Sequence, residues 1–349
     1  MSQNEKLYEY VGVVHIHTLD SDGTKPHEYI IKLAQKYNID FLMFTDHMTL
    51  ASRSKEGWYD DVLVIIGYEH EDPTGINHYL VFDVNEVLPR TLTPKEYVAR
   101  VREAGGIGII AHPFESRQMQ KYPPYPWTEW DTYQFDGIEI WNHMSSWLEG
   151  IACGNKLKYL LKPRSLLHAP PVLAIKKWDE LNLSRKVCGI ASADAHGYKL
   201  RLLKLFWRTV FPYKIGLNSL WTHILARSPI PESFQRAKDF VFDAIRECRV
   251  FISNRRWGDA RGFRFFAKSG SEFASIGDRI HLSPELRFFV VAPDSSDIIF
   301  VRNGEKIEKK HGKTAEFKPF EEGIYRVELL REGKVWIISN HIRVISDTK

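Results

Sequence analysis

Histidines and acidic residues recur where apolar runs of this chain end, and this pattern constrains the fold more than any other feature. The runs VGVVHIH (11–17), FLMFTDH (41–47), VLVIIGYE (62–69), IGIIAH (107–112) and CGIASADAH (188–196) read as buried strands. Over residues 8–200 they alternate with amphipathic stretches, which is typical of β/α units and a parallel sheet. Side chains at the C-terminal ends of parallel strands gather on one face of such a fold.

Nine potential metal ligands belong to this pattern. They are His15, His17, Asp22, His47, Glu69, His78, His112, Asp194 and His196. Imidazoles and carboxylates gathered on one face are ligands for divalent zinc, manganese or iron. Each motif alone also has a plain structural reading, such as an exposed strand face, a helix cap or a turn. Those readings must explain every position separately, whereas a metal centre explains them together.

At these motifs the chain resembles the PHP (polymerase and histidinol phosphatase) superfamily. The matching segments are HIHTLDSDG (15–23), FTDH (44–47), GYE (67–69), the histidine of NHYLVF (77–82), AHP (111–113), GIEIWN (137–142) and ASADAHG (191–197). The resemblance covers residues 8–200 and implies a metal-dependent phosphoesterase. It also implies a distorted seven-stranded β/α barrel of TIM-like form with two or three divalent metal ions (Mn, Zn or Fe).

The resemblance implies a ligand layout. One metal would be held by His15, His17, Glu69 and Asp194; a second by Glu69 as a bridge with His78 and His112; a third by Asp22, His47 and His196. Asp22 departs from members with histidine there and matches the branch that acts on small molecules and nucleotides. Asp46 is expected to accept a hydrogen bond from a ligand histidine and fix its tautomer. His70 and Glu71 are the alternatives to His78.

Clustered divalent ions suit phosphoester hydrolysis because they lower the pKa of bound water, neutralise phosphoryl oxygens and hold the leaving oxygen. We expect metal-bound hydroxide to be the nucleophile. Arg117 follows His112 on the same loop and is expected to bind the phosphate, because its planar fork matches phosphate oxygens; the alternative is a solvated loop charge. Glu139 and Asn142 are expected to orient ligands or substrate.

Composition places the chain among ordinary globular proteins. It has 349 residues, of which 44% are hydrophobic and 26% are charged. The length favours two domains. A net charge of +4 suits anionic substrates but falls short of a dedicated nucleic-acid binder. Three cysteines without paired spacing, no evident signal peptide and no long apolar run indicate a cytoplasmic protein without a membrane span.

Two domains are expected, a PHP barrel over 1–262 and a β-sandwich over 263–349. The sequence predicts helices at about 26–37, 94–104, 145–161, 172–181 and 233–247. From about residue 264 short strands alternate with turn signals, and Asn303-Gly304 and Glu332-Gly333 mark hairpins. This pattern indicates an immunoglobulin-like sandwich, through which the chain could oligomerise.

Residues 198–232 combine basic and aromatic side chains. The basic residues at the start of this segment are Lys199, Arg201, Lys204, Arg208 and Lys214. The segment either binds a nucleotide or single strand, or covers the barrel.

Four functions follow. The leading hypothesis is hydrolysis of a phosphate ester in a nucleotide or other phosphorylated small molecule. The alternatives are a nuclease that trims short single-stranded oligonucleotides with the same centre, and a non-catalytic, metal-stabilised binding protein. A metal-dependent amidohydrolase ranks lower, because the bridging position holds Glu69 and no lysine stands at a matching strand end.

Overall fold

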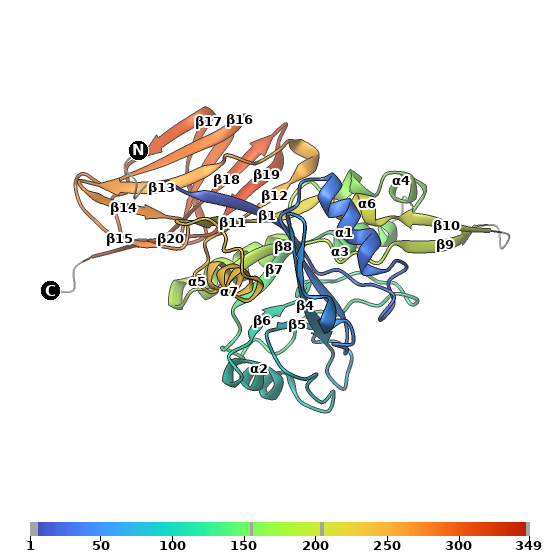
Figure 1. Ribbon diagram of the computed structural model, residues 1–349. Coiled ribbons are helices and arrows are strands. Elements are labelled where there is room, and N and C mark those ends of the chain that lie inside the picture. Colours follow the sequence, from blue (N-terminus) through green and yellow to red (C-terminus); the bar gives the residue numbers. More distant parts are fainter. Residues whose placement is uncertain (1–5, 154–155, 203–205, 347–349) are drawn as a thin grey trace.

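The protein is a mixed α/β structure with one large sheet and few helices, and the computed structural model describes residues 6–153, 156–202 and 206–346 (Figure 1). The helices are α1 (His27–Lys36), α2 (Pro94–Glu103), α3 (His143–Ala152), α4 (Lys156–Leu161), α5 (Val172–Ser184), α6 (Tyr213–Gly216) and α7 (Phe234–Arg246). No helix in these ranges is long and apolar enough to cross a membrane.

Twelve of the strands in the described ranges precede residue 262. They are β1 (Tyr8–Val14), β2 (Phe41–His47), β3 (Gly57–Tyr59), β4 (Val62–His70), β5 (Tyr79–Phe82), β6 (Ile107–Ile110), β7 (Gly137–Asn142), β8 (Cys188–Ser192), β9 (Tyr198–Leu202), β10 (Phe206–Phe211), β11 (Leu220–Ala226) and β12 (Val250–Asn254). The remaining strands are β13 (Arg264–Ser269), β14 (Glu272–Ser275), β15 (Arg279–His281), β16 (Arg287–Arg302), β17 (Glu305–Phe317), β18 (Gly323–Arg331), β19 (Lys334–Ser339) and β20 (Ile342–Ile345).

Strand pairing brings the predicted ligand motifs to one end of the sheet. β1, β2 and β4 are parallel neighbours, and so are β6, β7 and β8. β5 is antiparallel to both β4 and β6, so its N-terminal end lies beside the C-terminal ends of its neighbours. His78, directly before β5, therefore reaches the same end of the sheet. A parallel bridge between Ile16 and Ala195 joins the chain after β1 to the chain after β8.

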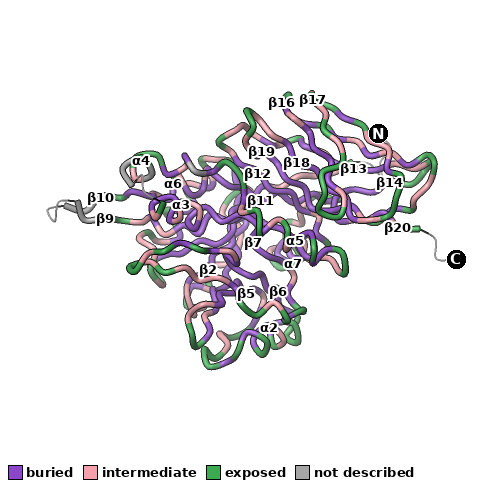
Figure 2. The backbone as a smooth tube through the Cα atoms, turned by 180° about the vertical axis from the view of Figure 1, so that it is seen from behind, coloured by how far each residue is buried: buried purple, intermediate pink, exposed green. Residues whose placement is uncertain are grey.

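The sheet continues from this part of the molecule into the C-terminal strands. β11 pairs with β1 and β12, and β12 pairs with β19 through Phe251–Ser339, Ile252–Ile338 and Ser253–Ile337. In Figure 1 the strands β13–β20 form the upper left of the molecule, while the β9–β10 hairpin projects at the right. The strands β2, β4, β5, β6, β7 and β8 are buried almost throughout, whereas β17 is mostly exposed or half-buried (Figure 2).

Local signals explain where most elements begin and turn. Pro94 starts α2 after a capping box between Thr93 and Glu96. The predicted helix at 145–161 is divided into α3 and α4, and residues 154–155 lie outside the described ranges. Both predicted hairpins are confirmed: Asn303-Gly304 joins β16 to β17, and Glu332-Gly333 joins β18 to β19. All four turn residues have the positive φ values that a type I′ turn requires.

A buried ion network ties α5 to the C-terminal strands. Nε and Nη2 of Arg326 donate to the two carboxylate oxygens of Asp179, each at 2.8 Å. Nη1 of Arg326 donates to Glu328 at 2.8 Å, and Nε2 of His341 lies 2.8 Å from Asp179. Every member of the network is buried, so each charge depends on its partners.

Candidate metal centre

Three of the predicted ligands occupy backbone conformations that are rare outside glycine. His15, His112 and Asp194 have φ of 65°, 28° and 48°. The backbone around His15 is fixed by bonds from His15 N to Met43 O (3.1 Å) and from Ala195 N to His15 O (3.2 Å). Left-handed non-glycine residues cost conformational energy and gather at functional sites. The turn away from the strand direction aims these side chains inward.

The Glu69 carboxylate is surrounded by imidazoles. Ring nitrogens of five histidines lie near it: His78 at 2.7 Å, His112 at 3.1 Å, His15 and His17 at 3.2 Å and His47 at 3.4 Å. Glu69 stands at the end of β4 and is buried, with 1% of its surface exposed. One carboxylate between five imidazoles has the geometry expected of a bridging ligand.

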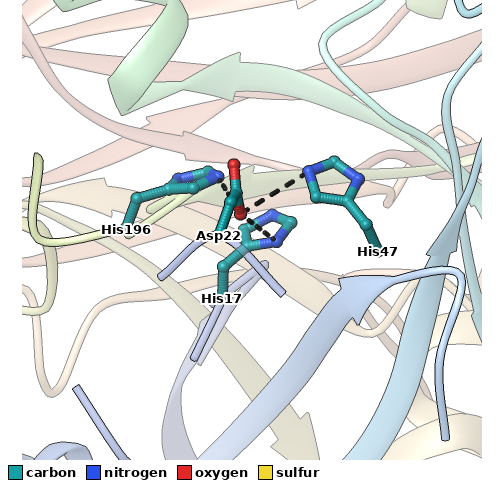
Figure 3. A group of neighbouring side chains, drawn as sticks. All are labelled: His17, Asp22, His47 and His196. Atoms are coloured by element: carbon teal, nitrogen blue, oxygen red, sulfur yellow. Dashed lines mark ion pairs between the residues drawn. The ribbon is translucent and has the colours of Figure 1, made fainter. Parts of the chain in front are cut away.

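A second cluster lies around Asp22 at the mouth of the site (Figure 3). Oδ1 of Asp22 lies 3.2 Å from His196 Nε2, 3.6 Å from His17 Nδ1 and 3.8 Å from His47 Nε2. The Ser21-Asp22-Gly23 loop folds back onto the strand end to place this carboxylate. A Cβ on Gly23 would lie 2.6 Å from the backbone of His17, so the loop needs glycine there.

The structure brings all nine predicted ligands into four overlapping groups whose ligand atoms lie within 4.8 Å of one another. The groups are His17, Asp22, His47 and His196; His15, His112 and Asp194; His15, His17 and Glu69; and Glu69, His78 and His112. His78, and neither His70 nor Glu71, joins Glu69 and His112 in the last group. Groups of imidazoles and carboxylates such as these bind zinc, manganese or iron in proteins.

Glu139 contacts two of the predicted ligands, His15 and His112, and orients them. Its Oε1 lies 2.7 Å from Nδ1 of His15, and its Oε2 accepts from the His112 backbone N–H at 2.7 Å. Asn142 donates through Nδ2 to Glu139 (2.8 Å) and Asp194 (3.2 Å). Because Nδ1 of His15 is engaged by Glu139, Nε2 faces the cluster.

Asp46 differs from its predicted contact. Its carboxylate accepts from Thr18 N and Thr18 Oγ1, both at 2.7 Å, and from Ser21 Oγ at 2.6 Å. The described contacts include no hydrogen bond from a ligand histidine to Asp46. It therefore holds the loop that carries Asp22, and the tautomer-fixing contact belongs to Glu139.

Electrostatics within the metal-free cluster separate the histidines into two kinds. Burial and the neighbouring His196 and His47 lower the pKa of His17 to about 4. Burial opposes charge on His47 and His112 as well, but carboxylates outweigh it: Glu69 and Glu71 raise the pKa of His47, and Glu115 and Glu69 that of His112, each to about 9. Burial likewise opposes ionisation of Glu69, yet the surrounding histidines lower its pKa well below the usual range.

The donor set fits divalent cations. Both ring nitrogens of His17 are buried, and their approaches to Glu69 (Nε2, 3.2 Å) and Asp22 (Nδ1, 3.6 Å) lack hydrogen-bond geometry. Unpaired buried polar atoms are costly and call for an explanation such as an ion. Several imidazole rings face carboxylate oxygens in this cluster. A cation between them would bind both the ring nitrogens and the oxygens.

A cavity of about 1230 Å³ opens over the ligands. Its wall includes Tyr122, Tyr125, Met144 and Leu148, which give it an apolar and aromatic side. The Tyr125 ring stacks on His78 with centroids 4.9 Å apart and an interplanar angle of 15°. The cavity is large enough for a substrate with a sizeable group attached to its phosphate.

Arg117 lines this cavity but is committed to its own loop. Nε donates to Tyr122 O at 2.9 Å and Nη2 to Pro123 O at 2.7 Å, and Nη1 forms an ion pair with Glu115. Its side chain is only 2% exposed. This differs from the phosphate contact predicted for Arg117: the guanidinium holds the loop that presents Tyr125.

Sequence reasoning missed two features near the site. The first is Arg90 with its partner Glu71, described below, which no motif marks. The second is a further group of Asp20, His27 and Asp46, whose ligand atoms also lie within 4.8 Å of one another. Nδ1 of His27 lies 3.5 Å from Lys55 Nζ. A lysine donating to Nδ1 leaves the proton on Nε2, which opposes metal binding there.

Part of the basic segment reaches the cavity. Tyr198, Lys199 and Thr209, on the β9–β10 hairpin, line its wall. Lys204 lies outside the described residues, as do the side chains of Arg201 and Arg208.

No family model matches the chain. An uncharacterized protein of Methanocaldococcus jannaschii is 27% identical over 166 residues, which cover 42% of this chain and 91% of that protein.

Two solved structures are similar at low identity. One is a two-domain protein of Bacteroides vulgatus containing a predicted PHP-like metal-dependent phosphoesterase, with 12% identity, a TM-score of 0.46 and coverage of 96% of this chain and 95% of that one. The chain resembles PHP-like metal-dependent phosphoesterases. The other structure, from Bifidobacterium adolescentis, is a protein to which metal-dependent phosphoesterase activity is ascribed; it has 13% identity, a TM-score of 0.33 and coverage of 53% and 87%.

The PHP resemblance predicted from the motifs rests on the motif residues, which the structure gathers into the groups described above. Similarity at these TM-scores carries no argument about activity.

Proposed function

We propose that the protein is a metal-dependent phosphoesterase that hydrolyses a phosphate ester in a nucleotide or other phosphorylated small molecule. The observation that carries the proposal is the buried Glu69 carboxylate with five imidazole nitrogens within 3.4 Å, at the floor of a large cavity. Such a site suits a polynuclear metal centre. The positive charge of the metals would offset the negative charge of the phosphate ester, which otherwise repels a nucleophile.

The proposed layout is the one expected from the motifs, with two metals sharing Glu69 and a third at Asp22, His47 and His196. When bound, divalent ions supply water activation and neutralise phosphoryl oxygens. The chain's share is positioning: Glu139 and Asn142 fix the ligand side chains, and Asp46 fixes the Asp22 loop. Preorganised groups of this kind lower the cost of reaching the transition state.

The proposed architecture is a distorted seven-stranded barrel followed by an immunoglobulin-like sandwich. Its support is the order β1–β2–β4–β5–β6–β7–β8 with the bridge from Ile16 to Ala195. The strands after residue 263 support the sandwich, because they pair antiparallel except for β15 with β20. A reducing, cytoplasmic setting is proposed on the free thiols of Cys153, Cys188 and Cys248.

A nuclease acting on short single strands is the second candidate. Tyr198 and Lys199 in the cavity wall favour it, because aromatic rings stack on bases and lysines meet backbone phosphates. A salt-sensitive activity on oligonucleotides would support it.

Product analysis by chromatography tests both candidates. Chelator-treated protein reconstituted with manganese would receive a nucleoside monophosphate, a nucleoside bisphosphate and a short 5′-phosphorylated oligonucleotide, with Asp194→Ala as the negative control. Free phosphate from the small substrates supports the phosphatase, and mononucleotides from the oligonucleotide support the nuclease. No product from any of the three would overturn the nuclease and the nucleotide phosphatase. Non-nucleotide phosphate monoesters then test the rest of the proposal, and no release of phosphate from them would overturn it.

A further inference from the structure

In sites that act on phosphoryl groups, arginine or lysine side chains commonly bind the phosphoryl oxygens together with metal ions. Among the residues the structure describes, the cavity wall contains three permanent cations: Arg90, Arg117 and Lys199. Their contacts differ, and the difference decides which of them is available to a substrate.

Arg117 is not available. Each of its three guanidinium nitrogens already faces an oxygen of its own loop, and 2% of the side chain is exposed. A substrate oxygen could reach this group only by displacing buried contacts, which are expensive to break without replacement.

Arg90 is both available and oriented. Its Nη2 lies 2.6 Å from Oε2 of Glu71, and 56% of its side chain is exposed. Within the described part of the chain no protein acceptor is recorded for Nε or Nη1. The other oxygen of Glu71 lies 2.9 Å from Nδ1 of His47. A single carboxylate therefore separates the Arg90 guanidinium from a predicted metal ligand.

Lys199 is available but not oriented. It is exposed on β9, and no ion pair is recorded for its ammonium group among the described residues. A flexible ammonium is a point charge, whereas a guanidinium held at one nitrogen presents its remaining donors in a fixed plane.

We propose that Arg90, held by Glu71, is the residue that binds the non-bridging oxygens of the substrate's phosphoryl group at this centre. The proposal rests on the proposed function and assigns to Arg90 the contact that the sequence suggested for Arg117. Glu71 is the positioning residue: it holds the guanidinium on one side and His47 on the other, so phosphate contact and metal ligand keep a fixed relation.

The test uses the full-length protein reconstituted with manganese and compares Arg90→Ala, Arg90→Lys and Lys199→Ala. Arg100→Ala is the matched control, because Arg100 is an exposed arginine on the neighbouring helix α2 outside the cavity wall. Inorganic phosphate binding is measured by calorimetry, and hydrolysis of p-nitrophenyl phosphate by steady-state kinetics. Metal content and melting temperature are recorded for every variant.

Loss of a charge-assisted, two-pronged contact should weaken phosphate binding by about 10- to 100-fold in Arg90→Ala and raise KM by a similar factor. Metal content and melting temperature should not change. Arg90→Lys should recover only part of the affinity, because an ammonium lacks the fork. Lys199→Ala should change phosphate affinity by less than about threefold, since its charge is exposed and screened.

Phosphate affinity that is equal in Arg90→Ala and Arg100→Ala would overturn the proposal. A loss of activity in Arg90→Ala that is seen only with larger substrates carrying a second anionic group would also overturn it. Arg90 would then bind that second group, because p-nitrophenyl phosphate has a single anionic group. Arg90-dependent phosphate binding without any hydrolysis would sustain this assignment while removing the proposed function. Hydrolysis that does not depend on Arg90 would remove this assignment and leave the proposed function standing.

Discussion

Nδ1 of His15 lies 2.7 Å from Oε1 of Glu139, and neither side chain has more than 1% of its surface exposed. Burial alone disfavours charge on His15, but Asp194, Glu139 and Glu69 outweigh it and raise its pKa well above the usual value. The contact directs the other ring nitrogen, Nε2, to Glu69 at 3.2 Å. Glu139 therefore sets the ring orientation of His15, a predicted metal ligand.

Glu139→Gln should weaken metal binding by about 10- to 100-fold, because an amide neither holds the ring as firmly nor raises its basicity. Competition with a chromogenic chelator measures this. Glu103→Gln, an exposed carboxylate at the end of α2, serves as the control. Equal metal affinity in the two variants would remove Glu139 from the centre.

Asp194→Ala and His15→Ala should lose metal and activity together, with a fall in turnover of more than about 100-fold, beyond the range typical of an outer partner. His47→Ala should reduce the metal content by one equivalent, because His47 belongs to the outer group with Asp22. Elemental analysis alongside activity measures both effects. Full activity in Asp194→Ala would eliminate the proposed centre.

Metal binding should release protons at pH 8. The pKa values of His47 and His112, each raised to about 9, mean that both rings are largely protonated in the metal-free protein at that pH. A coordinating nitrogen must be unprotonated, so metal displaces the proton. The released number should fall as pH rises through 9, and metal affinity should fall toward acid pH. Calorimetry in buffers of different ionisation enthalpy reports this directly; identical heats in all buffers would contradict it.

Asp179→Asn should destabilise the protein by about 3–5 kcal/mol, because it leaves the buried Arg326 guanidinium without its main counter-charge. Burial opposes ionisation of Asp179, but Arg326 and His341 prevail and lower its pKa to about 2. A depressed carboxyl pKa stabilises the folded state fully above the unfolded value of about 3.9 and loses that effect as pH falls toward 2.

Urea unfolding at pH 7 and thermal unfolding between pH 5 and pH 2 measure both parts of this prediction. Asp243→Asn, an exposed carboxylate on α7, is the comparison. If Asp179→Asn and the native protein lost stability in parallel between pH 4 and pH 2, the ion pair would not be the cause.

The sequence was sufficient for features that depend on local chemistry. Histidines and carboxylates gathered at strand ends, Pro94 at the start of a helix and the Asn303-Gly304 turn each follow from residue type and spacing, and the structure has them where expected. These features do not depend on contacts between residues that are distant in the sequence.

The contacts of Asp46, Arg117 and Arg90 could not be predicted in the same way. Each depends on which oxygen or donor a distant or looping segment presents. Arg117 follows His112 as a phosphate-binding arginine would, yet the carbonyls of Tyr122 and Pro123 return to meet it. Arg90 lies in a loop without any motif, and only folding brings it to Glu71.

The pairing of β12 with strands on both sides has a consequence for anyone who shortens this chain. β11 covers one edge of β12 and β19 covers the other. A fragment ending at residue 262 would bare the second edge, with open N–H and C=O groups along an apolar strand. Such an edge templates pairing between molecules. We expect the fragment to aggregate although it would contain every predicted metal ligand, because the C-terminal strands protect this edge in the full chain.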